Sequence, residues 1–113
     1  MTRLGRQYII RLESCQDVTF VDSSWLITSV TAVAIESGLS IVKEVYHNFE
    51  PMGLTLALIL STSHLLLHTW PEHSMVIVDL FLCQDGFAVD SFVNKLADVT
   101  KAASFNIECV FDE

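Results

Sequence analysis

Side chains alternate with a period of two along several short stretches of this chain, and this pattern constrains the fold more than any other feature. The clearest stretches are 54–61, where leucine occupies every second position, and 75–83. Weaker versions of the pattern cover 5–13, 40–49, 63–69 and 105–111. A period of two is typical of a β-strand whose two faces differ in burial. The sequence therefore predicts six short strands.

Two other segments have helical spacing. Asp22 or Ser23 is expected to cap a helix that runs to about Ser37, with Gly38 ending it. A second helix is predicted over 87–102, where apolar residues recur every three or four positions. The order β-α-β-β-β-β-α-β predicts an α+β fold, a two-layer α/β sandwich with a largely antiparallel sheet and two helices on one face. The other face of the sheet is left free for a ligand or a second subunit.

Composition excludes several classes of function. The 113 residues are enough for one domain, predicted to span residues 1–113. Hydrophobic residues make up 51%, which excludes disorder and exceeds what one small core needs, so a subunit contact is expected. Six Lys and Arg stand against fourteen Asp and Glu, for a net charge of −8. No basic face can be assembled, which excludes a nucleic-acid interface and a polybasic membrane site.

A cytoplasmic protein without a membrane span or targeting segment is expected. Thr55 and Asp79 interrupt the longest apolar runs, which fall short of the ~20 residues that span a bilayer. The N-terminus lacks the apolar core of a signal peptide. The chain has an odd number of cysteines, Cys15, Cys83 and Cys109, and their spacing is not that of a metal site. Three reduced thiols are therefore expected.

Reactive side chains are densest between residues 61 and 73. His64, His68 and Glu72 are spaced by four residues, which on a helix would place three metal ligands on one face. Pro71 and the flanking strand patterns argue against that helix. On a strand, His64 and His68 would lie about 13 Å apart, too far to share one ion. No metal site is therefore predicted, and a structural role for these histidines is the ordinary alternative.

The order of residues in this region resembles the signature of a known enzyme family. Residues 61–72 read Ser-Thr-Ser-His-Leu-Leu-Leu-His-Thr-Trp-Pro-Glu, and residues 78–83 read Val-Asp-Leu-Phe-Leu-Cys. Together they resemble the signature of the short prokaryotic class of S-adenosylmethionine decarboxylase. The resemblance extends to 4–6, 36–38 and 47–53 and so covers most of the chain.

The resemblance implies self-cleavage between Thr62 and Ser63. In this class of enzyme an internal serine, matched here by Ser63, attacks the preceding carbonyl and is converted to a pyruvoyl group. That group replaces pyridoxal phosphate and forms a Schiff base with the substrate amine. The products would be a β chain of residues 1–62 and an α chain of residues 63–113.

Three further residues match catalytic positions of the family. Thr55 stands where the family has a serine whose hydroxyl stabilises the oxyanion of the cleavage step. His68 matches the base that removes the Cα proton of residue 63, and Cys83 matches the acid that reprotonates the product.

The resemblance also implies the substrate, S-adenosylmethionine, which is decarboxylated to the aminopropyl donor for spermidine. Phe49 matches an aromatic residue that stacks on adenine, and Glu72 a carboxylate that binds the ribose hydroxyls. Leu65 and Trp70 are further candidates for substrate binding. The site would be shared in a homodimer, with Ser63 and Cys83 from one protomer and Phe49, Thr55, His68 and Glu72 from the other.

Departures from the family pattern leave alternatives open. Thr62 stands where the family has Glu, and residues 73–77 differ from the usual small and aromatic residues. One alternative is a pyruvoyl-dependent arginine or ornithine decarboxylase of the same fold. Another is an unprocessed paralogue that serves as a binding or regulatory subunit. The role of Asp79 within an apolar strand stays open.

Overall fold

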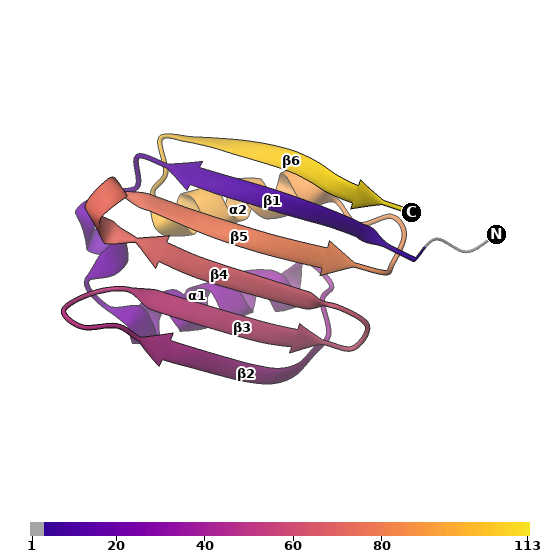
Figure 1. The fold of residues 1–113 in the computed structure, drawn as a ribbon, viewed down its shortest axis with the longest axis horizontal. Helices are drawn as coiled ribbons and strands as arrows, with labels where there is room; N and C mark the ends of the chain where they lie inside the picture. The colour runs from indigo at the N-terminus through magenta and orange to yellow at the C-terminus, as the bar shows by residue number, and fades with distance from the viewer. Residues whose placement is uncertain (1–3) are drawn as a thin grey trace.

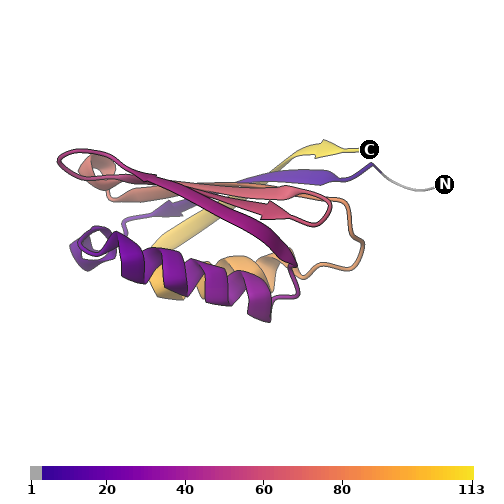
Figure 2. The same cartoon turned by 90° about the horizontal axis from the view of Figure 1, so that it is seen from below.

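The computed structural model describes residues 4–113 as one layer of six antiparallel strands and one layer of two helices (Figures 1 and 2). Residues 1–3 of the predicted domain lie outside the described residues. The elements in chain order are β1 (Arg6–Glu13), the 3-10 turn η1 (Asp17–Phe20), α1 (Ser23–Glu36), β2 (Ile41–Asn48), β3 (Leu54–Leu60), β4 (His64–Trp70), the 3-10 turn η2 (Pro71–His73), β5 (Met75–Leu82), α2 (Val89–Thr100) and β6 (Ser104–Asp112). The predicted fold class and element order are confirmed.

The strand order in the sheet is β2-β3-β4-β5-β1-β6, and every neighbouring pair is antiparallel. The first strand of the chain therefore lies between the last two. This arrangement follows from the short turns that join β2 through β5, while α1 and α2 supply the longer connections (Figure 1).

The alternation seen in the sequence separates the two faces of the sheet. One set of side chains on β3, β4 and β5 points toward the helices and forms the core, with Leu56, Leu58, Leu65, Val78 and Leu80 fully buried. Phe92, Val93 and Leu96 of α2 and Leu26 and Val30 of α1 meet them from the other layer. Figure 2 shows both helices on this one side of the sheet.

Helix ends follow the predicted signals at α1 and depart from them at α2. The Asp22 side chain accepts a hydrogen bond from the backbone N–H of Trp25 at 3.1 Å, and Gly38 follows the helix with φ of +95°. The helix α2 is two residues shorter at each end than predicted. Phe87 packs edge-on against Phe92 instead of joining the helix, and Lys101 ends it in the left-handed conformation.

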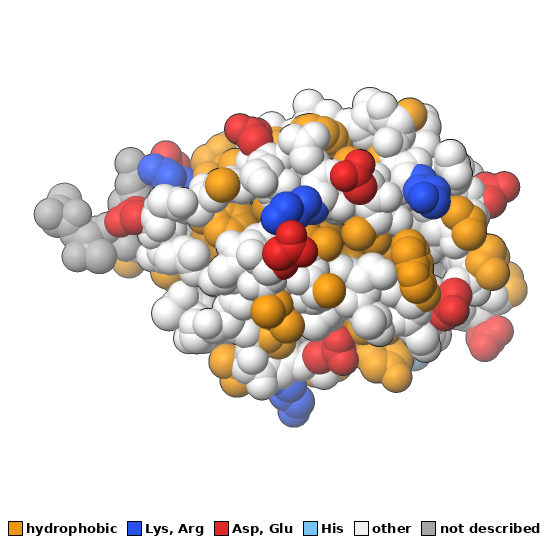
Figure 3. Space-filling model, turned by 180° about the vertical axis from the view of Figure 1, so that it is seen from behind, with side chains coloured by type: hydrophobic (Ala, Val, Ile, Leu, Met, Phe, Trp, Pro, Cys, Tyr) orange, Lys and Arg blue, Asp and Glu red, His pale blue; other side chains and the backbone are white. Residues whose placement is uncertain are grey.

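The other face of the sheet is open. Figure 1 looks onto this face, and in the described part of the chain no helix lies over it. Ile59, Leu66 and Trp70 point outward from it, with 44%, 40% and 41% of their surface exposed. On the helix side, charged side chains of both signs lie among apolar ones (Figure 3). No helix within residues 4–113 is long and apolar enough to cross a membrane.

Gly5, just before β1, packs too closely for a side chain. A Cβ atom at this position would lie 2.6 Å from the backbone oxygen of Leu82 and 3.0 Å from the Phe81 ring. We expect Gly5→Ala to destabilise the fold by about 1–3 kcal/mol, because the backbone of β5 has to shift. Thermal unfolding measures this effect, with the exposed Gln84→Ala as control. A melting temperature equal to that of the wild type would contradict the expectation.

Candidate active site

The turn between β3 and β4 presents the predicted cleavage site at one edge of the open face. Thr62 is exposed and Ser63 half-buried in this turn. Because β4 and β5 are antiparallel, with His64 opposite Phe81, the start of β4 lies beside the end of β5. Cys83 directly follows β5, and its Sγ donates a hydrogen bond to the backbone oxygen of Thr62 at 3.0 Å.

This hydrogen bond ends on the carbonyl of the Thr62–Ser63 peptide. A donor at that oxygen withdraws electron density from the carbonyl carbon and stabilises negative charge that develops on the oxygen during nucleophilic attack. The Ser63 hydroxyl belongs to the next residue along the chain. The cleavage end, defined as Thr62, Ser63 and Cys83, therefore brings together a serine hydroxyl, a peptide carbonyl and a thiol donor.

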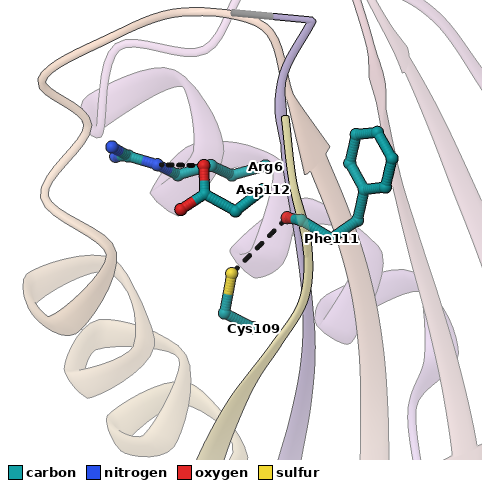
Figure 4. Close-up of polar contacts among 4 residues, drawn as sticks. All are labelled: Arg6, Cys109, Phe111 and Asp112. Atoms are coloured by element: carbon teal, nitrogen blue, oxygen red, sulfur yellow. Dashed lines mark hydrogen bonds and ion pairs between the residues drawn. The ribbon is translucent and has the colours of Figure 1, made fainter.

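The three thiols differ in setting, and all are free. Cys83 and Cys109 are exposed, whereas Cys15 is buried, and burial raises the pKa of its thiol. Cys109 Sγ donates to the Phe111 carbonyl at 3.5 Å within β6, near the Arg6–Asp112 ion pair (Figure 4). Of the three thiols, only Cys83 hydrogen-bonds the predicted cleavage site.

A second cluster occupies the opposite end of the open face. Thr55 on β3 and His68 on β4 face each other, and Thr55 Oγ1 and His68 Nδ1 are hydrogen-bonded at 2.6 Å. When Nδ1 carries the ring proton and donates it to Thr55, the other ring nitrogen of His68, Nε2, is free to accept a proton. The arrangement is thus suited to hold a histidine base in one tautomer.

Aromatic rings extend this second cluster. The ring centroids of His68 and Trp70 are 4.6 Å apart, and those of Phe49 and His68 are 6.0 Å apart. A pocket of about 270 Å³ lies among them and is lined by Phe49, Met52, Gly53, His68, Thr69, Trp70, Pro71 and Glu72. The pocket end, defined as Phe49, Thr55, His68, Trp70 and Glu72, therefore brings together five of the predicted residues.

His47 belongs to the same neighbourhood; it lies in the 47–53 stretch that carries the resemblance but was not predicted to be a site residue. Its ring lies 4.6 Å from that of Phe49, edge-on, and it stands opposite Thr55 in the sheet. A signal was present, because residues two apart on a strand share a face and His47 is two positions before Phe49.

The two ends do not meet within one protomer. Ser63 and His68 are separated by five residues along β4, or about 16 Å at 3.3 Å per residue. One chain therefore carries the predicted nucleophile and the predicted base at opposite ends of its open face.

Leu65 lies on the opposite face, fully buried beneath the helices. Only main-chain atoms of Leu65 are left to serve its predicted role in substrate binding.

Asp79 is half-buried and has one hydrogen-bond donor and one nearby histidine. Gln7 Nε2 donates to Asp79 Oδ1 at 2.9 Å, and His64 Nε2 lies 3.6 Å from the same oxygen.

His64 and His68 lie on a strand, as predicted, and not on a helix. No group of three or more His, Cys, Asp and Glu in residues 4–113 is arranged to hold a metal ion.

Comparison with known proteins identifies the family. A family model described as S-adenosylmethionine decarboxylase matches residues 6–111. The chain is 33% identical over 99 residues to the S-adenosylmethionine decarboxylase proenzyme of Synechococcus sp. strain WH7803, covering 88% of this chain and 77% of that protein. The chain belongs to the S-adenosylmethionine decarboxylase family.

Other members of the S-adenosylmethionine decarboxylase family differ in length from this one. The proenzyme of Pseudomonas paraeruginosa strain PA7 is 36% identical over 85 residues, covering 75% of this chain and 53% of that protein. The chain thus spans about half the length of its Pseudomonas relatives. The crystal structure of adenosylmethionine decarboxylase from Aquifex aeolicus VF5 matches with a TM-score of 0.83 at 19% identity, over 96% of this chain and 90% of that one, and so shares the fold.

Proposed function

We propose that this chain is an S-adenosylmethionine decarboxylase that cleaves itself between Thr62 and Ser63. The observation that carries the proposal is the hydrogen bond of 3.0 Å from Cys83 Sγ to the Thr62 carbonyl oxygen. A thiol donor at this carbonyl supports cleavage of the Thr62–Ser63 bond, because it would stabilise the charge that develops on the oxygen. The family membership, and the name proenzyme that its relatives bear, agree with a precursor that must be processed.

The cleavage would proceed in two stages. First, Ser63 Oγ bonds to the Thr62 carbonyl carbon, the Thr62–Ser63 C–N bond breaks, and the hydroxyl proton passes to the Ser63 nitrogen, which leaves an ester. Next, a base removes the Cα proton of residue 63 and the Cβ–O bond breaks, which releases Thr62 as a carboxylate and leaves dehydroalanine. Hydrolysis of that residue with loss of ammonia gives the pyruvoyl group.

The residues around Ser63 fit this group. Cys83 Sγ stabilises the oxyanion on Thr62 during the first stage and lies near residue 63 for the later chemistry. Once formed, the pyruvoyl carbonyl supplies the electron sink for loss of CO₂. Cys83 then donates a proton to the substrate carbon from which CO₂ has left.

The separation of the two ends supports a homodimer with shared sites. In an isologous dimer that packs the two open faces together, a two-fold axis near Leu66 would bring the cleavage end of one protomer to the pocket end of its partner. Leu66 lies midway between these ends on β4, and Ile59, Leu66 and Trp70 offer apolar surface to bury.

The pocket end suits an adenosyl sulfonium. Phe49 is 44% exposed and offers a ring face for adenine, and a sulfonium nearby would gain cation–π attraction. Glu72 is exposed in η2 at the rim of the same pocket, where its carboxylate can accept hydrogen bonds from ribose hydroxyls. Across the dimer, His68 would act as the base on residue 63 of the partner.

The purified wild-type protein tests the proposal directly. Intact mass and denaturing electrophoresis are expected to give two fragments, residues 1–62 and 63–113, and a carbonyl reagent is expected to label the second. Release of CO₂ from carboxyl-labelled S-adenosylmethionine, compared with labelled arginine and ornithine, identifies the substrate. A single 12.7 kDa chain that never reacts with the carbonyl reagent would overturn the proposal.

A further inference from the structure

His64, the residue after the proposed cleavage serine, has an unsatisfied ring nitrogen. Its Nε2 is buried and has no hydrogen-bond partner. The carboxylate of Asp79 lies 3.6 Å away, just beyond hydrogen-bond distance. The His64 ring stacks on Phe81 with centroids 5.9 Å apart and planes inclined by 20°, so the ring is held on the open face.

Asp79 is itself fixed in place from another strand. Gln7 on β1 donates to Asp79 Oδ1 at 2.9 Å, the same oxygen that faces His64. Leu66 is the direct neighbour of Asp79 on β4, so His64 reaches the carboxylate diagonally across the ladder. Residues on three adjacent strands, β4, β5 and β1, thus meet at one carboxylate.

We propose that His64 and Asp79 form a positioning pair that sets the geometry of the self-cleaving turn. This inference rests on the proposed function. The imidazole belongs to the residue next to Ser63, and the carboxylate lies four residues before Cys83 on β5. A bond between them ties the start of β4 to the strand that delivers the Cys83 thiol. The separation of 3.6 Å would have to shorten by only about 0.4 Å to reach hydrogen-bond distance.

Loss of this pair is expected to lower the rate of self-cleavage more than the stability of the fold. The acyl shift needs Ser63 Oγ, the Thr62 carbonyl and the Cys83 thiol to be aligned, and displacements of about 1 Å reduce such reactions severely. The pair touches none of the reacting atoms in the structure. His64 and Asp79 are therefore positioning residues and not catalytic ones.

A rescue experiment separates this role from simple packing. His64→Phe keeps a ring to stack on Phe81 but removes Nε2, and self-cleavage is expected to slow about tenfold or more. His64→Gln places an N–H donor at a similar distance from the backbone and is expected to cleave within about threefold of the wild-type rate. First-order rates from intact mass, together with the melting temperature of each variant, provide the measurement.

A double-mutant cycle tests whether the two residues act as a pair. Asp79→Leu is expected to slow cleavage as His64→Phe does, and the double variant is expected to be no slower than the slower single variant. Lys95→Gln serves as the matched control, because it breaks an ion pair of 3.0 Å with Glu36 in the helix layer, and its cleavage rate is expected to equal that of the wild type.

The outcomes distinguish this inference from the proposed function. A wild-type chain that never cleaves overturns both. A wild type that cleaves, with His64→Phe cleaving equally fast, overturns the pair alone. The pair is also overturned if the two single reductions in cleavage rate multiply in the double variant. It is overturned as well if His64→Gln cleaves as slowly as His64→Phe. Should His64→Phe not fold, Asp79→Leu alone, which removes the acceptor that faces His64, is expected to slow cleavage, and a wild-type rate there would overturn the pair.

Discussion

A chain carrying Ser63→Ala is expected to remain a single polypeptide of 12.7 kDa and to release no CO₂ from S-adenosylmethionine. Alanine has no hydroxyl to attack the Thr62 carbonyl, so neither the ester nor the pyruvoyl group can form. The expected loss of both cleavage and turnover is complete. Intact mass after prolonged incubation, followed by an activity assay, provides the measurement.

Ser61→Ala is the matched control for this experiment. Ser61 is an exposed serine of the same turn, two residues before Ser63, and its main-chain N–H bonds to the Ser40 carbonyl whatever its side chain. This variant is expected to cleave as the wild type does. Two fragments from the Ser63→Ala chain, or an uncut Ser61→Ala chain, would place the reaction elsewhere in the turn.

Co-expression of His68→Ala and Cys83→Ala chains is expected to recover activity that neither variant has alone. Each variant by itself is expected to lose activity about a hundredfold or more, because each removes a group that we propose transfers a proton. In a mixed dimer with shared sites, one site lacks both groups and the other is intact. Random pairing makes half of the dimers mixed, so about a quarter of wild-type activity is expected.

Leu66→Glu added to both chains is the control for this recovery. Leu66 lies at the middle of the open face beside Asp79, so the substitution adds a carboxylate there and brings like charges together across the proposed two-fold axis. Recovery should then disappear, and size-exclusion chromatography should report monomers. Recovery that persists in monomers, or the absence of recovery in proven mixed dimers, would show that each protomer builds its own site.

Much of the fold could be predicted because local and tertiary preferences agree. The leucines at every second position of β3 are all buried, and Asp22 caps α1 as its side chain and position indicate. Such patterns report burial directly, since one face of each strand meets the helices. The two 3-10 turns escaped prediction because they are short and carry no periodicity.

For the candidate site, the individual residues could be predicted, but the contacts between them could not. The contact between Cys83 and Thr62 depends on the register of β4 and β5, which long-range pairing sets and no local motif states. For the same reason the sequence did not reveal that Asp79 meets Gln7 and His64. The contact of His47 with Phe49 is local, so the period of two could have indicated it. The burial of Leu65 follows from its parity on β4, opposite to that of His64 and His68.

The position of β1 between β5 and β6 determines what a cut after Thr62 would leave behind. One product would hold β1, α1, β2 and β3, and the other β4, β5, α2 and β6, so the fragments would be interleaved within one sheet. Neither could depart without breaking ladders on both sides of β1. Processing would thus divide one chain into two that must find each other again, so recovery of even a single protomer from denaturation would depend on concentration.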